Sequence, residues 1–227
     1  VYCAAFAPDG KSVVTGGYDR RILVWRPEEV VKADFKNLGQ QKPVVPPAKY
    51  RELDGHATAV RALGFSHDGS LLLSGSQDNT VWLWDFALGT PIKSFRGHDG
   101  WVRGVALSND GRTLLTASHD ATVREWSIAG YEELRSLQGR RLEGHDDAVL
   151  AASFSPDQKL IVTASRDRTA RTWDARTGLA QHTFEEGHSF LASTAVFFDQ
   201  GRKLLTAAVD NTARVWDVAT GTQLARL

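Results

Sequence analysis

The sequence contains no methionine and only one cysteine, Cys3, in 227 residues. A single thiol cannot form the internal disulfide framework that supports many small secreted domains. It is consistent with a reducing compartment, and we expect a cytoplasmic protein. A natural reading frame begins with methionine, and a chain of this length usually contains several more. We therefore expect the sequence to be a fragment of a longer protein.

The sequence also lacks a long apolar run and an excess of either charge. No stretch has the length of a membrane-spanning helix, and Val1 does not begin a signal-peptide pattern. Lys+Arg and Asp+Glu both number 27, whereas domains that bind nucleic acid usually carry a clear basic excess. We expect neither a membrane segment nor a nucleic-acid partner, and the composition is that of a globular protein.

An internal repeat is the strongest signal in the sequence. Gly-His pairs occur at 55–56, 97–98, 144–145 and 187–188, and each His is followed 28 residues later by a Trp. Each of these Trp residues has an Asp six positions before it. Asp19 and Trp25 keep that last spacing in a first repeat without Gly-His. The Trp residues are 59, 42, 47 and 43 positions apart, and three of these periods suit one four-stranded propeller blade of about 40–45 residues.

Each repeat has the pattern of four short strands. In the second repeat, apolar and β-branched runs cover 59–65, 71–76, 80–85 and 91–95, with Gly, Asp and Asn turns between them. No helical periodicity interrupts these runs, so the pattern predicts four short strands separated by turns.

The spacing of Gly-His, Asp and Trp-Asp resembles that of the WD40 β-propeller family over nearly the whole chain, apart from 26–47. The resemblance implies an all-β propeller with five four-stranded blades, at approximately 1–53, 54–95, 96–142, 143–184 and 185–227. The chain starts and stops inside a repeat, and propellers close with about 4–8 blades. We therefore expect an arc of a larger ring of about seven blades; a closed ring of five is the alternative.

The resemblance also implies a buried tetrad of His, Ser or Thr, Asp and Trp in each complete blade. A hydroxyl residue does stand four positions before the Asp in all five repeats. A Ser/Thr–His–Asp set can also indicate a catalytic triad, but a triad occurs once in an enzyme, whereas this set recurs in every complete repeat. We interpret it as structural. The predicted members are His56, Ser74, Asp78 and Trp84; His98, Thr116, Asp120 and Trp126; His145, Thr163, Asp167 and Trp173; and His188, Thr206, Asp210 and Trp216.

No cofactor or metal site is predicted. The histidines outside the Gly-His pairs are His67, His119 and His182, and no Cys/His pair has the spacing of a zinc site. The Asp-containing turns lack the ligand series of a calcium loop, and no glycine pattern of a nucleotide-binding loop occurs.

Partner-binding residues are expected on one rim, where the resemblance places the Asp turns and the loops after Gly-His. The residue before the turn Asp differs in every repeat, as a recognition surface on a regular frame would: it is Tyr18, Gln77, His119, Arg166 or Val209. Trp101, three residues after His98, stands out because the equivalent positions hold Ala or Leu. Trp101 is either an exposed contact residue or packed between blades. Our candidates for partner binding are Tyr18, Gln77, Trp101, His119 and Arg166.

Two segments interrupt the repeat. Residues 26–47 form an insertion whose start resembles a short helix or turn, and whose Pro43 and Pro46 form a PxxP sequence, a weak signal for peptide docking. We expect a surface loop there. A shorter insertion at 129–137 is expected to lengthen a loop of the third blade.

These observations predict a non-catalytic scaffold that binds other proteins or peptides. The alternative is a regulatory or sensor module of a larger signalling enzyme, such as a kinase or an ATPase, whose catalytic domain lies outside this chain. An enzymatic propeller would need an unpaired acid, base or nucleophile in one blade only, and the sequence offers no convincing candidate.

Overall fold

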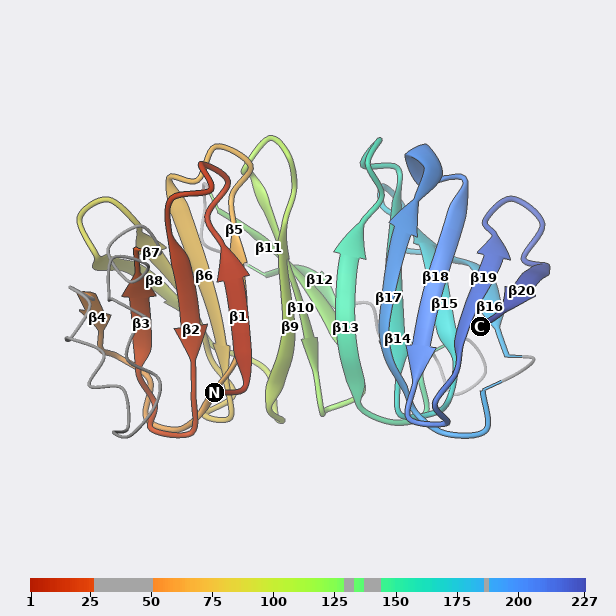
Figure 1. Ribbon diagram of the computed structural model, residues 1–227, viewed down its shortest axis with the longest axis horizontal. Helices are drawn as coiled ribbons and strands as arrows, with labels where there is room; N and C mark the ends of the chain where they lie inside the picture. Colours follow the sequence, from red (N-terminus) through yellow and green to blue (C-terminus); the bar gives the residue numbers. More distant parts are fainter. Residues whose placement is uncertain (27–50, 129–132, 137–143, 186–187) are drawn as a thin grey trace, which may run out of the picture.

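The computed structural model describes residues 1–26, 51–128, 133–136, 144–185 and 188–227, which form five antiparallel sheets of four strands each (Figure 1). The strands of every sheet follow in chain order, so each sheet is an up-and-down meander. The prediction of an all-β fold built from five four-stranded blades is confirmed. One short 3-10 turn, η2 (Asp199–Gly201), is the only helical element in the described ranges.

Twenty strands make up the five blades. The first blade is β1 (Cys3–Phe6), β2 (Val13–Gly16), β3 (Ile22–Trp25) and β4 (Arg51–Leu53); the second is β5 (Val60–Phe65), β6 (Leu71–Ser76), β7 (Val81–Asp85) and β8 (Thr90–Phe95). The third is β9 (Val102–Leu107), β10 (Thr113–Ser118), β11 (Val123–Ser127) and β12 (Glu133–Ser136). The fourth is β13 (Val149–Phe154), β14 (Leu160–Ser165), β15 (Ala170–Asp174) and β16 (Ala180–Phe184). The fifth is β17 (Ala192–Phe198), β18 (Lys203–Ala208), β19 (Ala213–Asp217) and β20 (Gln223–Arg226).

The blades stand beside one another in chain order, because the first strand of each packs against the first strand of the next. In Figure 1 these first strands run upward from the lower edge, where Val1 lies, and the turns between second and third strands return to that edge. The loops before the first strands and the turns that contain the repeated Asp therefore share one end of the molecule. We call this end the Asp-turn rim; its turns are centred on Asp19, Asp78, Asp120, Asp167 and Asp210.

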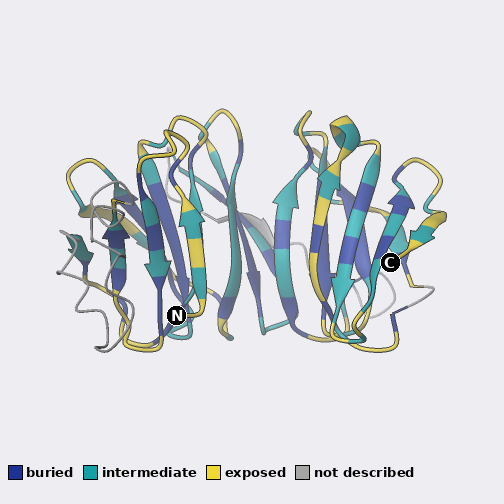
Figure 2. Cartoon of the chain, in the orientation of Figure 1, coloured by how far each residue is buried: buried dark blue, intermediate teal, exposed yellow. Residues whose placement is uncertain are grey.

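Burial depends on a strand's place in its blade (Figure 2). Five of the six residues of β6 are fully buried, because this second strand lies between two neighbouring blades. The outer strand β8 is mostly exposed. This explains why the second strands are runs of apolar and small residues without alternation, a pattern typical of strands that are covered on both faces.

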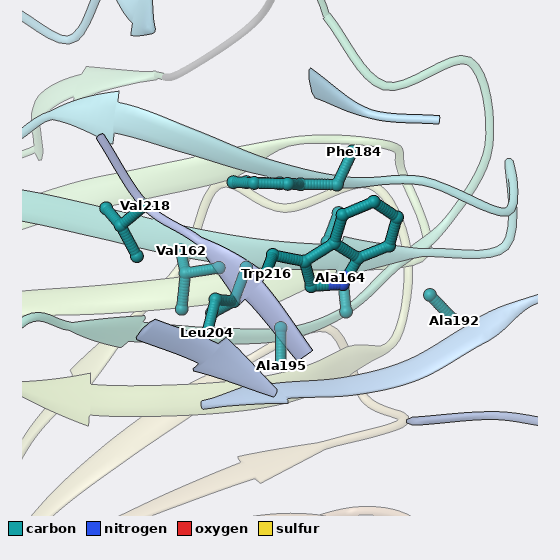
Figure 3. Close-up of a cluster of buried hydrophobic side chains, with 9 residues drawn as sticks. Val162, Ala164, Phe184, Ala192, Ala195, Leu204, Trp216 and Val218 are labelled. Atoms are coloured by element: carbon teal, nitrogen blue, oxygen red, sulfur yellow. The ribbon is translucent and has the colours of Figure 1, made fainter. Parts of the chain in front are cut away.

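Four hydrophobic clusters each join two consecutive blades. In the cluster between the fourth and fifth blades, the ring of Phe184 lies 5.3 Å from that of Trp216, beside Val162 and Leu204 (Figure 3). Each such side chain contributes about 1.5–3 kcal/mol on burial. The first and fifth blades also have apolar residues outside these clusters: Phe6 of the first blade is 73% exposed and Val196 of the fifth is 44% exposed. The expected ring of about seven blades stays a prediction.

One sequence expectation for the inserted segments is wrong. Residues 133–136, which we assigned to a lengthened loop, form β12, the fourth strand of the third blade, paired with β11. The register pairs Glu125 with Arg135, and Arg124 with Ser136. Most of the insertion at 26–47, with its PxxP sequence, lies outside the described residues, as do 129–132 and 137.

Candidate functional site

The predicted tetrad of the second blade is a continuous chain of hydrogen bonds below its Asp turn. Asp78 Oδ2 lies 2.9 Å from His56 Nδ1, and His56 Nε2 lies 2.7 Å from Ser74 Oγ. Trp84 Nε1 donates to the same hydroxyl at 2.8 Å. With the proton of His56 on Nδ1, the hydroxyl donates to Nε2 and accepts from the indole. Each polar group then has a partner in a dry environment.

The same chain occurs in the third, fourth and fifth blades. The distances from His Nδ1 to the carboxylate are 2.7, 2.7 and 3.1 Å, and those from His Nε2 to the hydroxyl are 2.6, 2.6 and 2.8 Å. The indole donates to the hydroxyl at 2.9, 3.0 and 2.9 Å. The structure therefore brings the four members of every predicted tetrad together: His98, Thr116, Asp120 and Trp126; His145, Thr163, Asp167 and Trp173; and His188, Thr206, Asp210 and Trp216.

The first blade contains only half of the chain. Trp25 Nε1 donates to Thr15 Oγ1 at 2.8 Å, as in the other blades. The turn residue Asp19 is exposed, and its carboxylate accepts from the backbone N–H of Arg21 at 3.4 Å. This blade is a natural control, because the same Asp position exists without the histidine.

Sequence reasoning missed a fifth member of the chain. In each blade with a complete tetrad, a threonine two positions after the Asp donates its hydroxyl hydrogen to the carboxylate; the four are Thr80, Thr122, Thr169 and Thr212. Thr169 Oγ1 lies 2.7 Å from Asp167 Oδ1 and 3.3 Å from His145 Nδ1. The signal was available, because the spacing Asp-x-Thr recurs in these four repeats and is Asp-x-Arg in the first.

Hydrogen bonds within the four tetrads lower the pKa of their carboxylates. Burial alone would raise the pKa of Asp167, but the hydrogen bonds from His145 and Thr169 outweigh it and hold the pKa well below its usual range. The pKa of Asp78 is lowered by the equivalent bonds against the same effect of burial. Burial lowers the pKa of His145, although Asp167 opposes the shift. The fourth tetrad therefore pairs a carboxylate with a neutral imidazole at neutral pH.

The tetrad hydroxyls are not placed for nucleophilic chemistry. Ser74, Thr116, Thr163 and Thr206 have 0% exposure. Each is held between an imidazole and an indole N–H, so neither a substrate nor water reaches it. A catalytic hydroxyl must approach its substrate and lie beside an oxyanion hole.

The predicted partner-binding residues lie on the Asp-turn rim at two kinds of position: directly before a turn Asp, or three residues after a tetrad histidine. In the second to fifth blades, the residue before the turn Asp donates its backbone N–H to the carbonyl of the residue three positions after the histidine. These bonds run from Gln77 to Ala59, His119 to Trp101, Arg166 to Ala148 and Val209 to Leu191, at 2.9–3.2 Å. This backbone contact explains why residues far apart in sequence form one surface. Tyr18 is 76% exposed, and the Arg166 side chain is 48% exposed.

Trp101 lies on the surface, and its contact partner is His119. Its side chain is 42% exposed, and its ring stacks on the imidazole of His119 at 5.1 Å with an interplanar angle of 29°. His119 and Gln77 are only partly exposed. Trp101 covers His119, and the side-chain oxygen of Gln77 accepts from Arg61 Nε at 3.0 Å.

A third kind of position on the rim, which sequence reasoning missed, is occupied by arginine in two blades. The first strands of the second to fifth blades each have a register shift near their second residue, typical of a β-bulge. The residues at this position are Arg61, Arg103, Leu150 and Ser193. A bulge redirects a side chain and is common next to functional sites. Arg61 and Arg103 lie on adjacent strands, β5 and β9, and the Arg61 guanidinium lies 5.7 Å from the ring centroid of Trp101.

A comparison with protein families decides what kind of chain this is. The model for the WD domain, G-beta repeat, matches residues 1–26, 48–85, 89–127, 136–174 and 178–217. The chain belongs to the WD40 repeat family.

Three WD40 relatives of the chain show how far the similarity extends. A probable cytosolic iron-sulfur protein assembly protein 1 of Cryptococcus neoformans is 33% identical over 101 residues, which cover 36% of this chain and 22% of the relative. A chromatin assembly factor 1 subunit of Mus musculus is 33% identical over 96 residues, 40% of this chain and 16% of the relative. The small ribosomal subunit protein RACK1 of Caenorhabditis elegans is 36% identical over 87 residues, 38% of this chain and 24% of the relative. The chain thus matches less than a quarter of each relative's length.

The described parts of this WD40 chain contain no group of three His, Cys, Asp or Glu side chains that could hold a metal ion. No helix in these ranges has the length and hydropathy needed to cross a membrane. A hollow of about 580 Å³ lies at the end opposite the Asp-turn rim, between the third and fourth blades, and Ser108, Glu125 and Lys159 are among its lining residues.

Proposed function

We propose that this WD40 chain is a non-catalytic scaffold that binds other proteins or peptides through its Asp-turn rim. The observation that carries the proposal is the exposed stack of Trp101 on His119, next to Arg166 on the same rim. Tryptophan, tyrosine and arginine are enriched at the energetic centres of protein interfaces. The candidate contact residues are Tyr18, Gln77, Trp101, His119 and Arg166.

The tetrads support a role without catalysis. Their hydroxyls are buried and paired on both sides, and the set repeats in four blades, so it stabilises a frame that can present variable residues. Neither a cofactor nor a nucleic-acid partner is part of the proposal.

The names of the three relatives agree with this proposal. Two describe assembly proteins and one a ribosomal subunit protein; none names a reaction, a kinase or an ATPase. The module of a larger signalling enzyme therefore has no observation in its favour. One name contains "cytosolic" and another "chromatin". We propose a cytoplasmic location, with which the single cysteine, Cys3, not paired in a disulfide, agrees.

Affinity capture with a pair of matched variants tests the proposal. The rim variant carries Trp101→Ala and Arg166→Ala, and the control carries Leu88→Ala and Arg112→Ala, two exposed residues in turns at the opposite end. We expect the rim variant to lose proteins that the unchanged chain and the control both retain, with equal melting temperatures. Identical protein sets from all three chains would contradict docking at this rim.

A further inference from the structure

Three arginines converge on the Asp-turn rim of a chain whose total charge is zero. Arg61 and Arg103 come from the bulged positions of β5 and β9, and Arg166 from the turn between β14 and β15. We call these three residues the arginine cluster. Since Lys+Arg and Asp+Glu both number 27, the local excess does not follow from the average composition.

Arg103 lies close enough to Arg61 and to Arg166 for their positive charges to act on it. Arg103 is partly buried, and its pKa is lowered by that burial and by the positive charges of Arg61 and Arg166. Burial also lowers the pKa of His119, and Arg103 and Arg166 lower it further. His119 is thus an uncharged nitrogen donor or acceptor beside the cluster at neutral pH. A positive potential of this kind favours an anion.

Among the described residues, Asp147 is the only carboxylate within 4.0 Å of an arginine of the cluster. Asp147 Oδ2 lies 4.0 Å from Arg166 Nε, and both side chains are about half exposed, so this pair is weak. Arg61 contacts neutral groups: its guanidinium lies 3.4 Å from the ring centroid of Tyr2, 5.7 Å from that of Trp101, and against the Gln77 amide.

Aromatic rings hold Arg61, one member of the cluster, in place. Tyr2 meets Tyr18 edge-on, with ring centroids 6.4 Å apart, and supports the Arg61 guanidinium on its face. Stacking on an aromatic ring leaves the N–H groups at the edge of a guanidinium free to donate. The rim therefore combines oriented cationic donors with an exposed indole surface.

We propose that the arginine cluster binds an anionic side chain, a carboxylate or a phosphate ester, in a peptide segment whose neighbouring apolar residue packs on Trp101. Both groups offer planar or tetrahedral oxygens that a guanidinium binds through paired hydrogen bonds. The inference rests on the proposed scaffold function and names the chemistry of its partner.

Binding of the whole chain to three pools of fluorescent decapeptides tests the inference. The pools share randomised flanking positions and carry Glu-Glu, phosphoserine or Gln-Gln at the centre. We expect one or both anionic pools to bind about tenfold more tightly than the Gln pool, a difference that corresponds to 1.4 kcal/mol. The Glu and phosphoserine pools distinguish the two sources of the anion.

Two variants and one control assign this preference to the cluster. Arg103→Gln and Arg166→Gln should each remove most of the preference for anions, whereas Arg112→Gln, in an exposed turn at the opposite end, should leave it unchanged. Equal melting temperatures show that the variants are folded. Removing a repelling charge should not destabilise the rim.

Each remaining outcome overturns the inference in a recognisable way. If all pools bind equally and Trp101→Ala weakens all of them, the rim docks peptides without selecting an anion, and the scaffold function stands. If no pool binds, the anionic-peptide assignment fails, and the affinity capture above decides the scaffold function independently. Tighter binding of a single-stranded oligonucleotide, lost in the same arginine variants, would assign the cluster to a nucleic acid.

Discussion

Replacing Asp167 with alanine tests the structural role of the tetrad most directly. Asp167 Oδ2 accepts from His145 Nδ1 at 2.7 Å and from the backbone N–H of Asp146 at 3.2 Å. Its Oδ1 accepts from the backbone N–H of Thr169 at 2.8 Å and from the Thr169 hydroxyl at 2.7 Å. Asp167→Ala removes both oxygens and leaves the histidine proton without its acceptor.

The loss of stability caused by Asp167→Ala depends on which of these donors can form a hydrogen bond with water instead. Asp146 is exposed, so water can replace the carboxylate there, but the His145 side chain is 2% exposed. A buried donor left unpaired costs about 1–3 kcal/mol. We expect the free energy of unfolding to fall by about 2–3 kcal/mol, the upper part of that range, because the Thr169 hydroxyl loses its charged acceptor as well. For a domain of this size, that loss lowers Tm by roughly 4–12 °C.

The free energy of unfolding in urea is measured for Asp167→Ala and, as a control, for Asp19→Ala. The control changes the same turn position in the blade that has no tetrad histidine. Asp19 is exposed and contacts a backbone N–H, so its loss should change stability by no more than about 0.5 kcal/mol. If both variants lose the same stability, the hydrogen-bonded chain does not account for the stabilising effect of the turn carboxylates.

Three further predictions concern pH, the missed threonine and the thiol. Acid should destabilise the fold. The pKa of Asp78 and of Asp167 is lower in the folded chain than in the unfolded chain, where it is near 4. Their contribution to the free energy of unfolding is therefore complete above about pH 4 and is lost as the pH falls toward the folded-state pKa. The lowered pKa of His145 acts in the same direction below about pH 6.5, so Tm measured from pH 7 to pH 3 should fall steadily; a constant Tm over this range would disprove the assignment. Thr169→Val keeps the shape but removes the hydrogen bond to Asp167, and should cost about 1 kcal/mol in urea unfolding, whereas no change would exclude the threonine from the chain. Burial raises the pKa of the Cys3 thiol to about 11, so alkylation at pH 8 should be slow in the folded chain and fast in urea; equal rates would show that the thiol is accessible.

The strands and the tetrads of the blades could be predicted from the sequence because the patterns that mark them are local. The spacing from Asp78 to Trp84 lies within one hairpin, and the turn between them needs a left-handed residue, which Asn79 provides with a φ of 66°. The strand runs of the second blade were predicted to within one residue of β5, β6, β7 and β8. The strand β12 was missed because its residues lie in a segment of the sequence that departs from the repeat spacing of the third repeat.

The chemistry of the rim could not be read in the same way. Arg61 and Arg166 are more than a hundred positions apart, and both lie near Arg103 only because successive blades lie side by side. The bulges at Arg61 and Arg103 depend on the pairing register, which the alternation of residues in one strand does not reveal. The sequence left two orientations open for Trp101, and its stacking on His119 depends on the backbone contact between their two loops.

The four clusters between blades have a consequence for how such a chain can change in evolution. Every cluster is completed by side chains from two consecutive blades, as Phe184 and Trp216 show, so the smallest stable unit is a junction and not a single repeat. Duplication of one repeat supplies both faces of a new junction at once, without any change to the existing ones. Selection can therefore alter the rim of one copy, as at Trp101, while the neighbouring copies preserve the frame.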